Sequence, residues 1–192
     1  MDAFLISTGI VALAEIGDKT QLLAFLLATR FRRPLPIVLG IFCATLANHA
    51  FAAAAGALVA RLLGPDAMRW VLGLAFLAMA AWIMVPDTIS DDDAPAQPRL
   101  GVFTATLVAF FFAEMGDKTQ VATVALAARY SSATLVVAGT TVGMMLANVP
   151  AVLFGDRIAG RVPLKLVHGC AAAIFVALGV ATLLGAGRKL GF

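Results

Sequence analysis

Two copies of one acidic motif stand out in a chain that is otherwise strongly apolar. AEIGDKTQ covers residues 14–21 and AEMGDKTQ covers residues 113–120, so the copies begin 99 positions apart and differ at one residue of eight. Carboxylate oxygens bind cations and protons, and the motifs therefore predict a site for one or both. The charged residues of the two copies are Glu15, Asp18 and Lys19, and Glu114, Asp117 and Lys118.

Both motifs lie near the middle of apolar segments. A charge at the centre of a bilayer costs about 2.5–3.5 kcal/mol even on the lenient insertion scale. Six such charges would therefore cost roughly 15–20 kcal/mol, which exceeds the net stability of a usual domain. These side chains must face the protein interior or a water-filled cavity, and they must have hydrogen-bonding or oppositely charged partners there.

The composition predicts an integral membrane protein. Of the 192 residues, 61% are hydrophobic and 13% are charged, whereas a soluble domain usually has about 25% charged residues. The net charge of +3 fits Lys and Arg at the membrane edges, and the basic residues form no stripe for nucleic acid. Cys43 and Cys170 suit neither a disulfide framework nor a zinc site, and we expect both to be packing residues. The N-terminus lacks the basic region of a cleaved signal peptide, so we expect a retained first span.

Six segments are long and apolar enough to cross the membrane, which takes about 20 residues. In lipid these segments should be helices, because a helix satisfies its own backbone hydrogen bonds. The expected fold is therefore an all-α polytopic membrane protein with six transmembrane helices. The segments are 3–29, 35–62, 69–86, 101–128, 132–154 and 164–186.

The chain divides into two similar halves. Residues 1–86 and 101–192 each hold three expected spans, and the polar linker 87–100 joins them. Further matches are Gly40 with Gly139, and the LAN stretches that end at Asn48 and Asn148. An odd number of spans in each half predicts inverted repeats, the pattern of many secondary transporters, whose sites lie near the bilayer midplane. The distribution of Lys and Arg slightly favours an N-terminus outside the cell.

On a continuous helix, the three charged residues of the first motif would share one face. At about 100° per residue, Asp18 lies about 60° to one side of Glu15, and Lys19 lies about 40° to the other. Gln21 extends this polar stripe, while Thr20 points elsewhere. Glycine at 17 and 116 allows close helix approach or local unwinding.

Each motif has two acids and one lysine, so the pair carries a net charge of −2. That charge matches one divalent cation or two protons. The alternative is a purely structural salt bridge within each motif, from Glu15 to Lys19 and from Glu114 to Lys118 at i,i+4 spacing. Buried ion pairs rarely add net stability, and we therefore favour an ion-binding site.

The candidate ligands are all hard oxygen donors, which suit Ca²⁺, Mg²⁺ and Mn²⁺. The four acids Glu15, Asp18, Glu114 and Asp117 are the expected metal ligands, and Lys19 and Lys118 balance their charge. Mg²⁺ gives up its water reluctantly, and Na⁺ fits a −2 site less well. Six further residues offer amide or hydroxyl oxygens to the ion or its surroundings: Gln21, Gln120, Thr20, Thr119, Asn48 and Asn148.

Several polar residues also have a purely structural interpretation. Asn48 and Asn148 also suit hydrogen bonding between helices. His49 suits a proton relay, but a lone histidine of this kind is more often a packing residue, and His168 lies near the end of a span. The acidic run at 91–93 reads as a solvated linker.

The two copies, EIGDKT at 15–20 and EMGDKT at 114–119, resemble a known family. Its members are small six-span proteins with a duplicated E-x-G-D-[KR]-[ST] motif, found in bacterial plasma membranes, chloroplasts and the Golgi and assigned to the cation/Ca²⁺ exchanger group. The resemblance covers nearly the whole chain and includes bacterial manganese exporters of the MneA type. It implies export of Mn²⁺, and in some members Ca²⁺, in exchange for protons.

The expected function is therefore Mn²⁺ export in exchange for H⁺, by alternating access at a midplane carboxylate site in a bacterial plasma membrane. The partners are the transported ion and the lipid bilayer, without nucleic acid, and no resident cofactor is expected. A Ca²⁺/H⁺ or Na⁺-coupled exchanger is the alternative. An intramembrane metalloenzyme is the least favoured reading, because the sequence has no H-E-x-x-H or similar signature. The sequence makes no prediction of oligomeric state.

Overall fold

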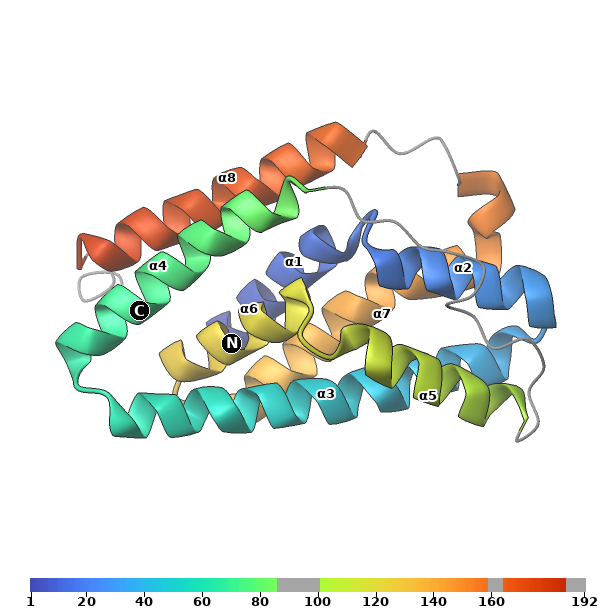
Figure 1. Ribbon diagram of the computed structural model, residues 1–192, viewed down its shortest axis with the longest axis horizontal. Helices are drawn as coiled ribbons and strands as arrows, with labels where there is room; N and C mark the ends of the chain where they lie inside the picture. The colour runs from blue at the N-terminus through green and yellow to red at the C-terminus, as the bar shows by residue number, and fades with distance from the viewer. Residues whose placement is uncertain (86–100, 159–163, 186–192) are drawn as a thin grey trace.

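Helices and short connections make up the part of the chain described by its computed structural model, which comprises residues 1–85, 101–158 and 164–185. No strand occurs in these ranges, and the all-α prediction is confirmed. The linker at 87–100, with its acidic run, lies outside the described residues. The helices, drawn in Figure 1, are α1 (Asp2–Glu15), α2 (Lys19–Phe31), α3 (Pro34–Leu62), α4 (Pro65–Ile83), α5 (Val102–Glu114), α6 (Lys118–Arg129), α7 (Ala133–Ile158) and α8 (Leu164–Leu183).

Both motifs interrupt a helix. In the first, α1 ends at Glu15 and α2 begins at Lys19, and in the second α5 ends at Glu114 and α6 begins at Lys118. The glycines at the breaks, Gly17 and Gly116, have φ of 84° and 77°, a left-handed conformation that glycine adopts without steric cost. The expectation of one continuous helix through each motif is therefore wrong. Local unwinding, the second of the two roles considered for these glycines, is what occurs.

The breaks change the number of helices. Where the sequence predicted six, the described ranges contain eight, because each motif divides an expected span in two. The four pieces have 14, 13, 13 and 12 residues, and each alone is shorter than the approximately 20 residues needed to cross a bilayer. Three helices in the described ranges are long and apolar enough to cross singly: Pro34–Leu62, Ala133–Phe154 and Lys165–Leu183.

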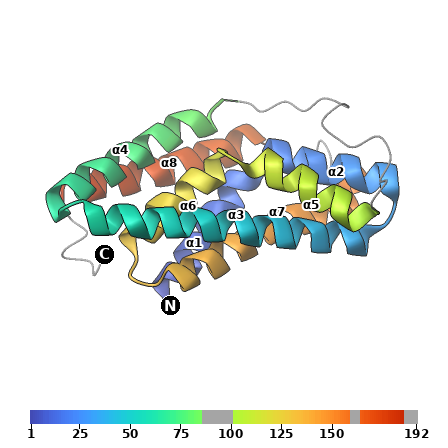
Figure 2. The same cartoon turned by 60° about the horizontal axis from the view of Figure 1, so that its bottom comes forward.

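The two long helices each pack against the motif-bearing helices of the other half of the chain. Helix α3 lies along α5 and α6, as Figure 2 shows, and α7 lies along α1 and α2. The halves are therefore interlocked rather than placed side by side. This arrangement brings the two breaks, which are far apart in sequence, into one region of the molecule.

Equivalent glycines make these contacts close. A Cβ at Gly40 would lie 2.9 Å from the carbonyl oxygen of Phe103, and a Cβ at Gly139 would lie 2.5 Å from that of Phe4. Gly40 and Gly139 are 99 positions apart, as are Phe4 and Phe103. The same contact thus occurs twice, each time between one half and the other.

Helices α4 and α8 pair with each other and lie over α6 and α1 (Figure 1). Gly73 packs against Leu183, and Gly179 packs against Leu77. The rings of Phe76 and Phe175 meet with their centroids 6.2 Å apart. The same kind of contact, a glycine of one helix against a leucine of the other, thus occurs once from α4 to α8 and once from α8 to α4.

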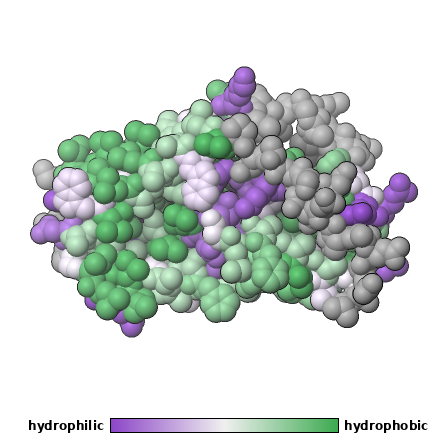
Figure 3. Space-filling model, in the orientation of Figure 1, coloured by the Kyte–Doolittle hydropathy of each residue, from purple (hydrophilic) through white to green (hydrophobic). Residues whose placement is uncertain are grey.

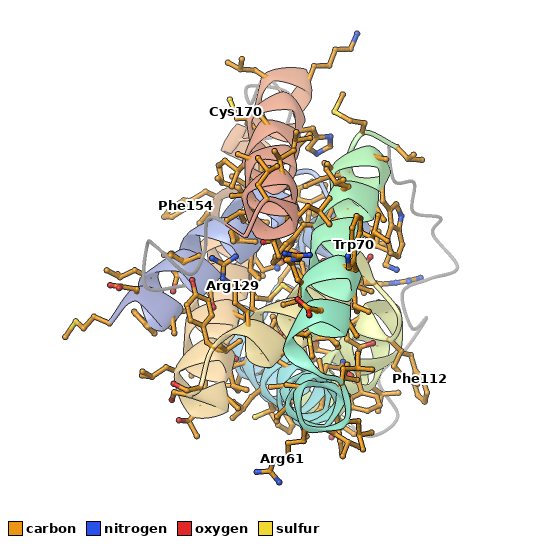
Figure 4. The ribbon with its side chains drawn as sticks, turned by 90° about the vertical axis from the view of Figure 1, so that its left-hand side faces the viewer. Arg61, Trp70, Phe112, Arg129, Phe154 and Cys170 are labelled. Carbon is orange, nitrogen blue, oxygen red and sulfur yellow. The ribbon has the colours of Figure 1, made fainter. Side chains whose placement is uncertain are left out.

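The outer surface is largely apolar. Figure 3 shows a mostly hydrophobic face with hydrophilic residues at its two ends and near its middle. Phe112 is 66% exposed, and in Figure 4 it points away from the bundle, as does Arg61 at the end of α3. Exposed apolar side chains of this kind suit contact with lipid. Both cysteines are free; Cys43 is partly buried, whereas Cys170 is exposed on α8, which does not suit the packing role expected for it.

We expect Gly139→Ala to destabilise the protein, because the new methyl group would overlap the Phe4 carbonyl of the neighbouring helix. Overpacking of this kind costs about 1–3 kcal/mol. Gly9→Ala is the matched control, since a Cβ there meets nothing within 4 Å and alanine favours a helix over glycine. Thermal unfolding of the detergent-solubilised variants measures both effects. Equal melting temperatures for the two variants would contradict the close packing described here.

Candidate cation-binding site

The four acids of the motifs are buried at the two helix breaks. Glu15 and Glu114 are the last residues of α1 and α5, and Asp18 and Asp117 are the N-caps of α2 and α6. Their exposed fractions are 0%, 0%, 2% and 2% in that order. An aspartate at an N-cap is favoured by the free N–H groups and the dipole of the helix that follows. Each break therefore places one carboxylate at a helix end and another at a helix start.

The two breaks have the same local hydrogen bonds. The N–H of Asp18 donates to the Glu15 carbonyl at 3.0 Å, and the N–H of Asp117 donates to the Glu114 carbonyl at 3.2 Å. The acid pair of each motif is thus fixed by a tight backbone turn.

The glutamines support these turns from the first turn of the following helix. The Oε1 of Gln21 accepts from the N–H of Gly17 at 2.8 Å, and the Oε1 of Gln120 accepts from the N–H of Gly116 at 2.7 Å. The Nε2 of Gln21 also donates to the Ala147 carbonyl at 3.0 Å. The amide oxygens of Gln21 and Gln120, which the sequence suggested as ion ligands, therefore accept hydrogen bonds from the backbone of the breaks.

The threonines lie in the site and bind the glutamates. The hydroxyl of Thr20 donates to Glu15, and the hydroxyl of Thr119 donates to Glu114 at 2.9 Å. The expectation that Thr20 points elsewhere is wrong, because it assumed a continuous helix.

The lysines form ion pairs that cross from one motif to the other. Lys118 Nζ lies 3.2 Å from Asp18 Oδ1, and Lys19 Nζ lies 3.7 Å from Asp117 Oδ1. The sequence analysis considered a salt bridge within each motif, from Glu15 to Lys19 and from Glu114 to Lys118. The structure has pairs between the motifs instead. The break accounts for the difference, since it separates each lysine from the helix that ends at its own glutamate.

The two crossed pairs differ in exposure. The Lys118 side chain is 2% exposed, whereas that of Lys19 is 34% exposed. At the breaks themselves, Met115 is 55% exposed and Ile16 is partly buried. Nearly identical sequences therefore occupy unlike surroundings.

The two asparagines have different hydrogen-bond partners around the site, and the two histidines also differ in their surroundings. Asn148 Nδ2 donates to Glu15 Oε1 at 3.0 Å, but Asn48 Nδ2 donates to the backbone carbonyl of Phe111 at 2.9 Å. His49 is buried, and neither ring nitrogen has a hydrogen-bond partner among the described residues. His168, expected near a span end, lies against Ile16 in the first break, and no sequence signal indicated this contact.

Several oxygens of the site are buried without a donor. In the described ranges Glu15 Oε2, Glu114 Oε1 and Asp117 Oδ2 have no hydrogen-bond partner, and the same holds for Asn148 Oδ1. Burying such oxygens is costly unless a cation or proton compensates them. As the side chains stand, however, the described residues include no group of three or more acidic, histidine or cysteine side chains close enough to hold one metal ion. Binding an ion therefore requires the side chains to rearrange.

Comparison with known proteins gives the chain a family. The model of the divalent cation/proton antiporter GDT1 matches residues 3–91 and 102–189. The chain belongs to the GDT1 family. It is therefore a membrane transporter and not an enzyme, in agreement with the resemblance noted in the sequence.

Individual relatives support this assignment over most of the chain. A Vibrio cholerae protein named "Putative manganese exporter" is 51% identical over 183 residues, which cover 95% of this chain and 90% of that protein. A GDT1-like protein of Synechocystis is 28% identical and covers 87% of this chain and 89% of its own. GDT1-like protein 3 of Oryza sativa is 26% identical, with coverages of 94% and 73%. No solved structure matches the chain.

We expect Lys118→Met to destabilise the protein far more than Lys19→Met. The first change removes an ammonium group from a buried ion pair, which costs about 3–5 kcal/mol. The second removes a lysine that is 34% exposed and 3.7 Å from Asp117, so the attraction that is lost is weaker and more screened by solvent. Thermal unfolding in detergent compares the two variants, which differ only in the motif they alter. Similar losses of stability would show that the exposure difference between the pairs has no energetic counterpart.

Proposed function

We propose that this antiporter exports Mn²⁺ from the cytoplasm in exchange for H⁺, with Glu15, Asp18, Glu114 and Asp117 as the ion ligands. The observation that carries the proposal is the set of buried carboxylate oxygens without donors, contributed by both motifs. The family supplies the reaction class. The name of the Vibrio cholerae relative supports manganese as the exported ion, and a bacterial inner membrane is the proposed location.

The proposed membrane topology has six spans arranged as two inverted three-helix repeats. The broken pairs α1–α2 and α5–α6 each count as one span, and α3, α4, α7 and α8 supply the others. The contacts repeated at a spacing of 99 residues support this division. So does the two-segment match to the family model. Broken helices that meet at the midplane are a usual site for coupling ions in transporters.

The charge of the site suits the exchange of one divalent ion for two protons. Four carboxylates and two lysines leave a net charge of −2 when all six groups are ionised. One Mn²⁺ neutralises that charge, and so do two protons. Hard oxygen ligands also match the preference of Mn²⁺ for carboxylate and carbonyl groups.

The crossed lysines compete with the ion for the aspartates. We place Lys19 as the first to move, because its side chain is partly exposed and its ion pair with Asp117 is the longer one. Lys118 keeps Asp18 paired on the buried side. As Mn²⁺ enters, Lys19 swings toward the solvent, and all four acids turn carboxylate oxygens to the ion, while Asp18 stays paired with Lys118 through Oδ1.

Alternating access follows from the interlocked halves. Both ion pairs join one motif to the other, so an ion bound between the motifs would contact both halves of the chain at once. Rocking of the halves then exposes the ion on the other side, where protons displace it. In this scheme Gln21 and Gln120 hold the breaks rather than the ion.

We expect Glu15→Gln and Asp117→Asn each to reduce Mn²⁺ flux into proteoliposomes by roughly 100-fold, by analogy with the larger losses seen when metal-site groups are changed. Each variant keeps the size of the side chain and removes its charge. Ser7→Ala is the control, since Ser7 is also a fully buried polar residue of α1 but lies outside the motif. Undiminished Mn²⁺ flux in both acid variants would refute the proposed ligands.

We expect Mn²⁺ movement in one direction to move protons in the other. Vesicles that contain a pH-sensitive dye should report this proton flux when Mn²⁺ is added outside, and Glu15→Gln vesicles should report none. Parallel additions of Ca²⁺, Mg²⁺ and Na⁺ measure selectivity. A proton flux that is larger with Ca²⁺ than with Mn²⁺ would transfer the substrate assignment to Ca²⁺, and Mn²⁺ flux without any proton flux would contradict the proposed coupling.

A further inference from the structure

His168 of α8 makes a direct contact with the break in the first motif. Its Nε2 lies 2.9 Å from the carbonyl oxygen of Ile16, which is 152 positions away in the chain. Because a carbonyl oxygen only accepts hydrogen bonds, Nε2 carries the hydrogen and donates it. The contact therefore ties the last helix of the second half to the motif of the first half.

The Ile16 carbonyl needs such a donor because the helix stops at this point. Ile16 follows the end of α1 with φ −65° and ψ 114°, and the last carbonyls of a helix have no N–H of their own helix to accept from. The Glu15 carbonyl already accepts from the N–H of Asp18. An unpaired carbonyl away from water is costly, and His168 satisfies this one.

The second motif provides an internal comparison. Its turn has the same backbone bond and the same glutamine support as the first. Met115 occupies the position of Ile16, but no side chain in the described ranges donates to its carbonyl. Met115 is also 55% exposed, whereas Ile16 is partly buried. The histidine contact is thus a feature of one motif alone.

We propose that His168 is a positioning residue for cation binding: by holding the Ile16 carbonyl, it fixes Glu15 relative to Asp18. This inference rests on the proposed function, in which those two acids are ligands. Only Ile16 and Gly17 separate the two acids, so a shift of the Ile16 carbonyl would move Glu15 relative to Asp18. The turn is also held by the N–H of Asp18 and by Gln21, and we expect loss of the histidine to loosen it rather than to unfold it. Ion binding would then have to restore the geometry of the acid pair, and affinity would fall.

A purely structural role for His168 makes a different prediction. If the histidine only helps α8 to pack, its loss would lower the amount of folded protein or its melting temperature. The molecules that remain folded would then bind the ion with unchanged affinity. Measurements of KM and of equilibrium Mn²⁺ binding separate the two roles, because neither depends on the fraction of protein that folds.

The test compares wild type with His168→Ala, His168→Asn and His168→Gln in proteoliposomes. The N–H of glutamine reaches about as far as Nε2, whereas asparagine stops one bond short. We expect His168→Ala and His168→Asn to raise KM for Mn²⁺ roughly tenfold, as for other groups that orient metal ligands, with kcat changed by less than about threefold. His168→Gln should keep a KM near that of wild type. Cys170→Ala, at an exposed position of the same helix, should change neither value.

Isothermal titration of the detergent-solubilised proteins with MnCl₂ should show the same order of affinities. If the His168→Ala variant does not fold, comparison of His168→Asn with His168→Gln still decides the question, because both side chains are polar and only glutamine reaches the carbonyl. Equal KM values for His168→Asn, His168→Gln and wild type would overturn the role of His168. A wild-type protein that neither transports nor binds Mn²⁺ would instead overturn the proposed function.

Discussion

The structure depends on one constraint: six ionisable side chains lie in an apolar bundle, and none of them can remain there unpaired. Charges in such surroundings need partners at close range, and the chain supplies them from both motifs. Lys118 pairs with Asp18 and Lys19 with Asp117. These pairs form only if the two breaks meet, and the breaks meet only because α3 and α7 each pack on the other half of the chain. The close contacts at Gly40 and Gly139 are therefore part of the same requirement as the ion pairs.

Breaking the helices is what makes a site from these charges. On a continuous helix, the acids and the lysine of one motif would line a single face and could neutralise one another locally. The turn at Gly17 instead makes Glu15 the end of one helix and Asp18 the start of the next. The lysine then reaches across to the other motif, and carboxylate oxygens such as Glu15 Oε2 are left without a donor. A buried oxygen in that condition favours a cation or a proton, and this is the chemistry that a cation/proton antiporter uses.

The sequence predicted those features that depend on local composition. Hydropathy predicted helices in place of strands, and the cost of a charge in lipid predicted that Glu15 and Glu114 would be buried. The sequence indicated local unwinding at the glycines only as one of two possibilities, because the argument at 100° per residue assumed a continuous helix. A signal was present: glycine followed by aspartate, with glutamine three residues after that, is typical of a helix start. The crossed pairing of the lysines and the contact of His168 with Ile16 had no such signal, since they depend on which helices pack together.

The difference between the two motifs connects this structure to transport. Both breaks have the same turn and the same glutamine support, yet Lys118 is buried where Lys19 is partly exposed. In the proposed mechanism, the second state of the transporter has these surroundings exchanged between the two motifs. Alternating access needs two such states that differ little in free energy. The bond from His168 to Ile16 has no counterpart at Met115 in the described part of the chain, so under this mechanism it favours the arrangement seen here over the exchanged one. The proposal therefore assigns the two states to the duplicated motif, and the difference in their free energies to residues outside it.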